Sequence, residues 1–218
     1  FSNWLSSIKI NFLPKSIIDN SIGQNNEKKG VFITNLKSEP FYEINKINYF
    51  IDADVSIYLL SMLWVIRVGK LLDKEISPDC LGNRLENNEY SNDQLPTRAF
   101  KIYISQYEKW RDQAIEVGLS SLKSGNNIFL VALDIKECFY RIKISFAEIN
   151  KIIKTQVDNE EERKLCLRLN YLLERIHNAY QDHIKTNHYL EITHGFSANK
   201  KITSLPIGLP SSSVLCNW

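Results

Sequence analysis

Residues 128–134 read IFLVALD, a run of apolar and β-branched residues that ends in one carboxylate. A short run of this kind is typical of a buried β-strand. A carboxylate at the end of such a strand is held by the strand and still faces water, which suits a hard, oxygen-seeking cation such as Mg²⁺. The pattern therefore predicts a buried strand and makes Asp134 a candidate site residue, although one acid at a strand end does not define a site.

A second segment with the features of a ligand-binding turn lies near residue 208, in the sequence LPIGLPSSS (205–213). Gly208 lacks a Cβ and lets backbone approach a ligand closely, while the two flanking prolines stiffen the turn. The serines could donate hydrogen bonds or cap the helix expected after them. The simpler interpretation is a plain turn at the start of a helix.

Taken together, the two segments resemble a known family. FLVALDIKECFYRI (129–142) resembles motif A of reverse transcriptases, and LPIGLPSSSVLCNW (205–218) resembles their motif B. In motif A, the positions of the metal-binding Asp and the aromatic gate are matched by Asp134 and Phe139. In motif B, the matching positions are Pro206, Gly208, Ser212 and Asn217. Ile207 replaces the Gln of most retroviral and group II intron enzymes and is similar to bacterial abortive-infection and defence-associated reverse transcriptases.

The resemblance implies a right-hand polymerase fold of the α+β class, rich in helices. Residues 1–125 would form an N-terminal and fingers-like region, and residues 126–218 would form part of the palm. It also implies an RNA-directed or template-independent DNA polymerase that acts in antiphage defence. Its partners would be an RNA template or non-coding RNA, deoxynucleoside triphosphates and the DNA product, with a second copy or a partner protein also possible.

The resemblance also implies a role for each site residue. Asp134 would bridge two Mg²⁺ ions, and the carbonyl of Ile135 would complete the metal shell. The ring of Phe139 would exclude a 2′-hydroxyl and so favour deoxynucleotides. Pro206, Gly208 and Ser212 would lie at the nucleotide. Arg84, in a looser match to the region before motif A, is a candidate triphosphate ligand, with an exposed surface arginine as the alternative.

One element of the family pattern is absent from the sequence. The second metal-binding element, usually read as YxDD, follows motif B, and no pair of adjacent aspartates occurs in the 218 residues. We therefore expect the sequence to be a piece of a longer protein and to be inactive alone. Two alternatives stay open: a reverse-transcriptase-like scaffold that binds RNA or a protein partner, and an unrelated helical protein.

Composition fits a packed globular chain. Hydrophobic residues make up 44% and charged residues 24%, with 8 Gly and 6 Pro, which excludes a disordered, collagen-like or disulfide-stapled protein. The net charge of +2 does not by itself indicate a nucleic-acid partner.

The four cysteines form no CxxC pair and suggest a reducing cytoplasm. The longest apolar stretch, residues 55–66, is too short to span a membrane. The four histidines lack the spacing of a helical zinc pair.

Apolar periodicity predicts helices from Asp54 to near Asp73, from Thr97 to Gly125, after a capping box at Ser145, and a long one from Asp158. In the second helix we expect the aromatic stripe to pack in the core, with a base-stacking surface as the alternative; the stripe comprises Phe100, Tyr103, Ile104, Tyr107, Trp110 and Ala114. Residues 31–36 and 189–193 are candidate strands.

Overall fold

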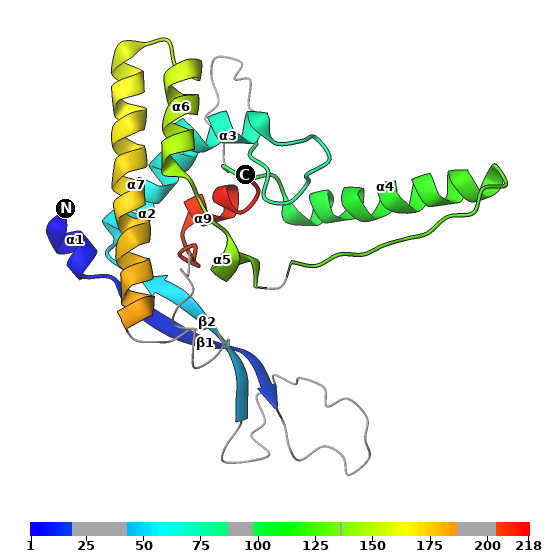
Figure 1. Cartoon of the computed structure of the whole chain (residues 1–218), viewed down its shortest axis with the longest axis horizontal. Helices are drawn as coiled ribbons and strands as arrows, with labels where there is room; N and C mark the ends of the chain where they lie inside the picture. Colours follow the sequence, from blue (N-terminus) through cyan, green and yellow to red (C-terminus); the bar gives the residue numbers. More distant parts are fainter. Residues whose placement is uncertain (19–42, 87–97, 136, 187–203) are drawn as a thin grey trace.

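The computed structural model describes residues 1–18, 43–86, 98–135, 137–186 and 204–218. It is a mixed helix-and-strand structure in which helices predominate, which confirms the α+β class (Figure 1). Its elements are α1 (Ser2–Ser6), β1 (Lys9–Ile18), β2 (Glu43–Asp52), α2 (Val55–Trp64), the π-helix η1 (Val65–Gly69), α3 (Lys70–Glu75), α4 (Tyr103–Lys123), α5 (Cys138–Arg141), α6 (Phe146–Gln156), α7 (Glu160–Thr186) and α9 (Pro210–Leu215). The candidate strands at 31–36 and 189–193 lie outside the described residues.

The two strands form one antiparallel hairpin. They pair from Lys9 opposite Asp52 to Ile18 opposite Glu43, with an irregularity between Pro14 and Ile17. Next to α7 the hairpin buries Ile10, Tyr49 and Ile51, together with Ile8 just before β1. The cluster that they form also contains Ile176, Tyr180 and Ile184 of α7. Its other end extends away from the helices (Figure 1).

The predicted helix from Asp54 to near Asp73 is confirmed, and the helical stretch is longer than the apolar run 55–66. The Asp54 carboxylate accepts a hydrogen bond from the backbone N–H of Ser56 at 2.8 Å, as an N-cap should. Helix α2 continues through η1 into α3, so that residues 55–75 form 21 helical residues. An 18-residue window of this stretch has a mean hydropathy of 1.7, so the stretch is long and apolar enough to cross a membrane. A buried helix of a soluble protein has the same properties, and 44% of this stretch is buried inside the structure.

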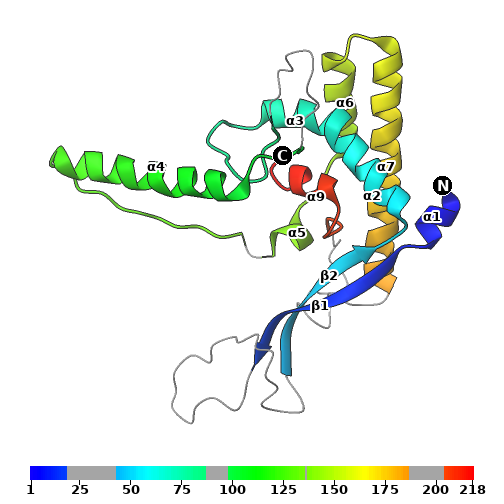
Figure 2. The ribbon, with the colours of Figure 1, turned by 180° about the vertical axis from the view of Figure 1, so that it is seen from behind.

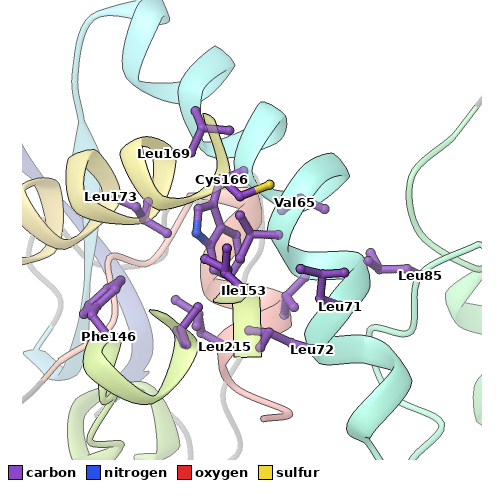
Figure 3. Packing of buried hydrophobic residues seen from close by; sticks show 14 of the residues in the cluster. Val65, Leu71, Leu72, Leu85, Phe146, Ile153, Cys166, Leu169, Leu173 and Leu215 are labelled. Carbon is purple, nitrogen blue, oxygen red and sulfur yellow. The ribbon is translucent and has the colours of Figure 1, made fainter. Parts of the chain in front are cut away.

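The main core lies where α6, α7 and α9 pack around α2, η1 and α3 (Figure 3). Trp64, Ile149, Ile153, Leu173 and Leu215 are completely buried there. Helix η1 packs on α9 at Gly69, where a Cβ would lie in ordinary van der Waals contact with the Trp64 ring and Val214, at 3.6 Å. Residues from both predicted parts of the chain, 1–125 and 126–218, contribute to this one cluster. We call these six elements the body.

A buried polar contact set ties the helices of the body together. Asn170 of α7 accepts a hydrogen bond from the indole N–H of Trp64 at 3.1 Å. Its amide nitrogen donates to the carbonyl of Phe146 and to the side chain of Asn150. The N-cap half of the capping box, at Ser145, is confirmed, since the Ser145 hydroxyl accepts from the backbone N–H of Glu148. The long helix begins at Glu160, with Asn159 rather than Asp158 accepting from the Glu162 N–H.

Helix α4 and residues 126–135 form a projection that we call the arm. Helix α4 extends away from the body, and the chain returns beside it, as both views show (Figures 1 and 2). Gly125, with φ of +79°, ends the helix as predicted. No residue of α4 is buried, so the expected core packing is wrong for the members of the aromatic stripe in this helix. Phe100, which precedes α4, does pack against the core. Within α4, Tyr107 lies against both Tyr103 and Trp110, with ring centroids 6.2 and 5.8 Å apart.

The prediction of a buried strand at 128–134 is wrong as well. These residues are extended, but they pair with no strand within the part of the chain that the structure describes. Phe129 is 93% exposed and Leu133 is 91% exposed. A strand is stabilised by a hydrogen-bonded neighbour and by a layer that covers its apolar face. Residues 128–134 have neither here, although Ile128 lies beside Gly118 of α4.

Candidate functional site

The two segments that suggested a site lie side by side in the structure. The backbone N–H of Leu205 donates to the carbonyl of Phe139 at 2.7 Å. Close by, the sulfur of Cys138, at the start of α5, lies 3.3 Å from the sulfur of Cys216, just after α9. Residues more than sixty positions apart in sequence are therefore joined at two points, so that α5 and residues 204–218 form one local unit.

The turn at Gly208 is held by β2. The backbone N–H of Ile51 donates to the carbonyl of Ile207 at 2.9 Å, and Ile207 forms a parallel bridge with Phe50. Gly208 is exposed and has φ of +109°, a backbone conformation that side chains with a Cβ rarely adopt. The strand thus fixes the turn on one side, and Gly208 presents open backbone on the other.

The polar groups of the residues near Gly208 form hydrogen bonds within the chain. The Ser212 hydroxyl donates to the carbonyl of Pro206 at 2.7 Å, and both residues are buried. The Ser211 backbone N–H donates to the hydroxyl of Ser61 at 3.0 Å, and the two serine hydroxyls lie 2.8 Å apart. Pro206 and Ser212 therefore hold the shape of the turn, and Gly208 is the predicted nucleotide-binding residue of this turn that lies at the surface.

Three tyrosines fix α5 against the hairpin. The Tyr140 hydroxyl oxygen accepts a hydrogen bond from the backbone N–H of Tyr49 at 3.1 Å, and the Tyr180 hydroxyl donates to the carbonyl of Tyr49 at 2.8 Å. Burial raises the pKa of Tyr140 to about 12, so this phenol stays neutral. Phe139, the neighbour of Tyr140, is half-buried at the edge of the core. Sequence reasoning missed these tyrosines, because contacts across 91 and 131 residues leave no local pattern.

Asp134 lies at the surface, on the extended return of the arm. Among the described residues it has no hydrogen-bonding or ionic partner, and Ile135 beside it is 71% exposed. The five residues from Asp134 to Phe139 can span at most about 18 Å, so the acid belongs to the neighbourhood of α5. The described residues contain no group of three His, Cys, Asp or Glu side chains that could hold a metal ion.

One carboxylate does not fit a site for two Mg²⁺ ions, which needs further acidic ligands to neutralise and position both ions. The described residues therefore supply at most one ligand of such a site, and no reaction step is assigned to magnesium.

Arg84 has a structural role. Its five N–H groups all donate within the chain: to both carboxylate oxygens of Asp73 and to the carbonyls of Asp73, Ser77 and Cys80. The side chain is 12% exposed, so the alternative of an exposed surface arginine is wrong, and no N–H group is left for a triphosphate. Asn217, a motif B position, donates from its side-chain amide to the carbonyl of Gly82 and ties this loop to the end of α9.

His177 is buried in the body. Its ring packs edge-on against Phe146, with centroids 5.2 Å apart. Complete burial lowers the pKa of His177 to about 3, so the ring is neutral near pH 7.

Comparisons of this chain with protein-family models, with curated proteins and with solved structures find no match. The interpretation of the site therefore rests on the residues of the two segments and on the contacts that join them.

Proposed function

We propose that this chain is the nucleotide-facing part of a reverse transcriptase of the right-hand polymerase type, acting in bacterial antiphage defence. The observation that carries the proposal is the hydrogen bond from Leu205 to Phe139. It joins the two segments that resemble motifs A and B, which in such an enzyme would face one deoxynucleoside triphosphate. Two separate segments that merely resembled a family by chance would have no reason to lie together.

The proposed reaction joins a deoxynucleotide to a primer or protein hydroxyl and releases pyrophosphate. This chain would contribute binding and discrimination. The exposed backbone at Gly208 would lie against the nucleotide, and the ring of Phe139 would occupy the space that a 2′-hydroxyl needs. Phe139 suits this task because its neighbours hold it: Tyr140 is anchored to Tyr49, and the Phe139 carbonyl is bonded to Leu205.

The test is deoxynucleotide incorporation by the protein as the cell produces it, with RNA templates and Mg²⁺. Asp134→Asn should abolish incorporation, and Asp112→Asn, which removes an exposed acid from α4, is the matched control and should leave it intact. Phe139→Ala should increase the use of ribonucleotides relative to deoxynucleotides, measured by competition. Full activity of Asp134→Asn would refute the role of Asp134, and unchanged sugar selection would refute the role of Phe139.

A second candidate, a non-enzymatic scaffold, is favoured by the arm. Helix α4 exposes Tyr103, Tyr107 and Trp110, and its charges balance, with three basic and three acidic residues: Lys109, Arg111, Lys123, Glu108, Asp112 and Glu116. An apolar surface without net charge fits a protein partner better than a phosphate backbone. This candidate predicts no nucleotide incorporation and an antiphage phenotype that is lost with Trp110→Ala but kept with Asp134→Asn.

A further inference from the structure

Two cysteines from distant parts of the sequence meet at the candidate site. Cys138 opens α5 and Cys216 follows α9, and their sulfur atoms are 3.3 Å apart. The sequence contains no CxxC motif, and 78 residues separate the two positions. The other two thiols offer natural controls: Cys80 lies on the nearby loop, and Cys166 is buried in the body.

The backbone around this pair is fixed on both sides. The bond between Leu205 and Phe139 holds α5 next to the chain that leads to α9, and the contact of Ser211 with Ser61 holds the start of α9. A disulfide has a sulfur–sulfur distance of about 2.0 Å, so the sulfurs need to approach by only about 1.3 Å, which small side-chain rotations can provide.

Both thiols are half-buried, so a small oxidant can reach them from solvent. Burial and the contact with Cys138 raise the pKa of Cys216 to about 12, so Cys216 is a poor first nucleophile near pH 7. The first attack is therefore assigned to Cys138, and Cys216 completes the reaction.

We infer that Cys138 and Cys216 are a modification site, a dithiol that a small-molecule disulfide oxidises to an intramolecular disulfide joining α5 to the end of α9. With oxidised glutathione, the Cys138 thiolate attacks one glutathione sulfur, forms a mixed disulfide and releases one reduced glutathione. The Cys216 thiol then gives up its proton, attacks the Cys138 sulfur and releases the second reduced glutathione. The protein loses two hydrogen atoms and two electrons, and the oxidant gains them.

The inference does not depend on the proposed function. If that function holds, the disulfide also locks Phe139 relative to the turn at Gly208, because Cys138 is its direct neighbour and Cys216 closes the segment that begins with this turn. Oxidation would then change sugar selection or nucleotide affinity. The crosslink itself is measured without any assay of activity, so failure of either inference can be recognised separately.

The experiment is oxidation of the folded protein with glutathione redox buffers, followed by alkylation and peptide mapping. We expect a peptide crosslinked through Cys138 and Cys216, with two fewer alkylated thiols, in the wild type and in Cys80→Ser. Cys138→Ser and Cys216→Ser should not form it, and Cys216→Ser should keep glutathione on Cys138. The crosslinking rate should rise with pH, because Cys216 must lose its proton.

A second measurement uses phenylarsine oxide, which bridges two adjacent thiols. The reduced wild type and Cys80→Ser should bind it at least tenfold more tightly than Cys138→Ser or Cys216→Ser. The inference is overturned if the folded wild type forms no Cys138–Cys216 crosslink in a buffer that oxidises dithiothreitol, or if crosslinks through Cys80 form equally well. Mixed pairings are expected only after unfolding in urea, where geometry no longer selects the partner.

Discussion

The body and the arm contain similar apolar residues, which are buried in the body and exposed to solvent in the arm. In the body, Trp64, Ile153 and Leu173 are completely buried, whereas in the arm Trp110 is 57% exposed and Leu133 is 91% exposed. The difference lies in the number of layers. Helices α6 and α7 form a hairpin that covers α2, η1 and α3, while α4 has only one extended segment beside it. Apolar residues thus form a core only where a second packed layer is present.

The largest expected difference between the two regions concerns their tryptophans. Trp64→Ala removes a fully buried ring and leaves the acceptor Asn170 without its indole partner, so we expect a loss of about 3–5 kcal/mol in the free energy of unfolding. Trp110→Ala removes the same side chain from the arm and should change this free energy by less than about 0.5 kcal/mol. Urea unfolding followed by circular dichroism measures both. Equal losses would show that the arm is packed as tightly as the body.

The pH dependence of stability sharpens the comparison, because His177 lies inside the body. Its pKa is about 3 when folded and about 6.5 when unfolded, so the unfolded chain binds the proton more readily. The contribution of neutral His177 to the free energy of unfolding is fully present above pH 6.5. It falls as the pH drops toward 3, by up to about 1.4 kcal/mol per pH unit. His177→Leu should unfold with a shallower dependence between pH 4 and 6. The same slope in wild type and variant would contradict a buried neutral His177.

The turn at Gly208 lies on the surface, but its backbone is held by the hydrogen bond between Ile207 and β2. Gly208→Ala places a Cβ on a backbone with φ of +109°, although the space beside it is sufficient. We expect a loss of about 1–3 kcal/mol in the free energy of unfolding from the backbone conformation alone. Gly118→Ala is the matched control in α4, where the backbone is helical. A neutral Gly208→Ala variant would mean that the turn adopts another conformation.

The smallest expected effect is in the extended part of the arm. Leu133→Asn replaces an apolar side chain that is 91% exposed, so the free energy of unfolding should stay within about 0.5 kcal/mol of the wild type. Amide hydrogen exchange gives a second measurement, with rapid exchange expected at 128–135 and slow exchange in α7. A loss above 2 kcal/mol would show that this segment pairs with another strand in solution.

Local signals in the sequence predicted most of the helices. Asp54 and Ser145 cap the helices that follow them, and Gly125 ends α4, because capping depends on residues within one turn of the cap. The buried strand at 128–134 was predicted wrongly, since burial depends on a neighbour that an apolar run does not specify. The π-helical turn at Val65–Gly69, inside the predicted helix, also has no recognised sequence pattern.

The candidate site was predictable only in part. The resemblance selected Phe139 and Gly208, and the structure brings their segments together. It also selected Arg84 and Ser212, whose polar groups are used within the chain. Which donors are already occupied depends on contacts such as Arg84 with Asp73 and Ser212 with Pro206, and residue type alone does not reveal them. The polymerase assignment and its magnesium ions stay predictions that the incorporation assay tests.

The bridge between Phe50 and Ile207 has a consequence for folding. It closes a loop of more than 150 residues, whereas the contacts of α6 with α7 are local and form quickly. On a ribosome, the hairpin and the helices from α2 to α7 are made before residue 207 emerges. The Gly208 turn is therefore assembled after these elements, and a chain halted before that residue would hold most of its helices while β2 lacks its hydrogen bond to Ile207.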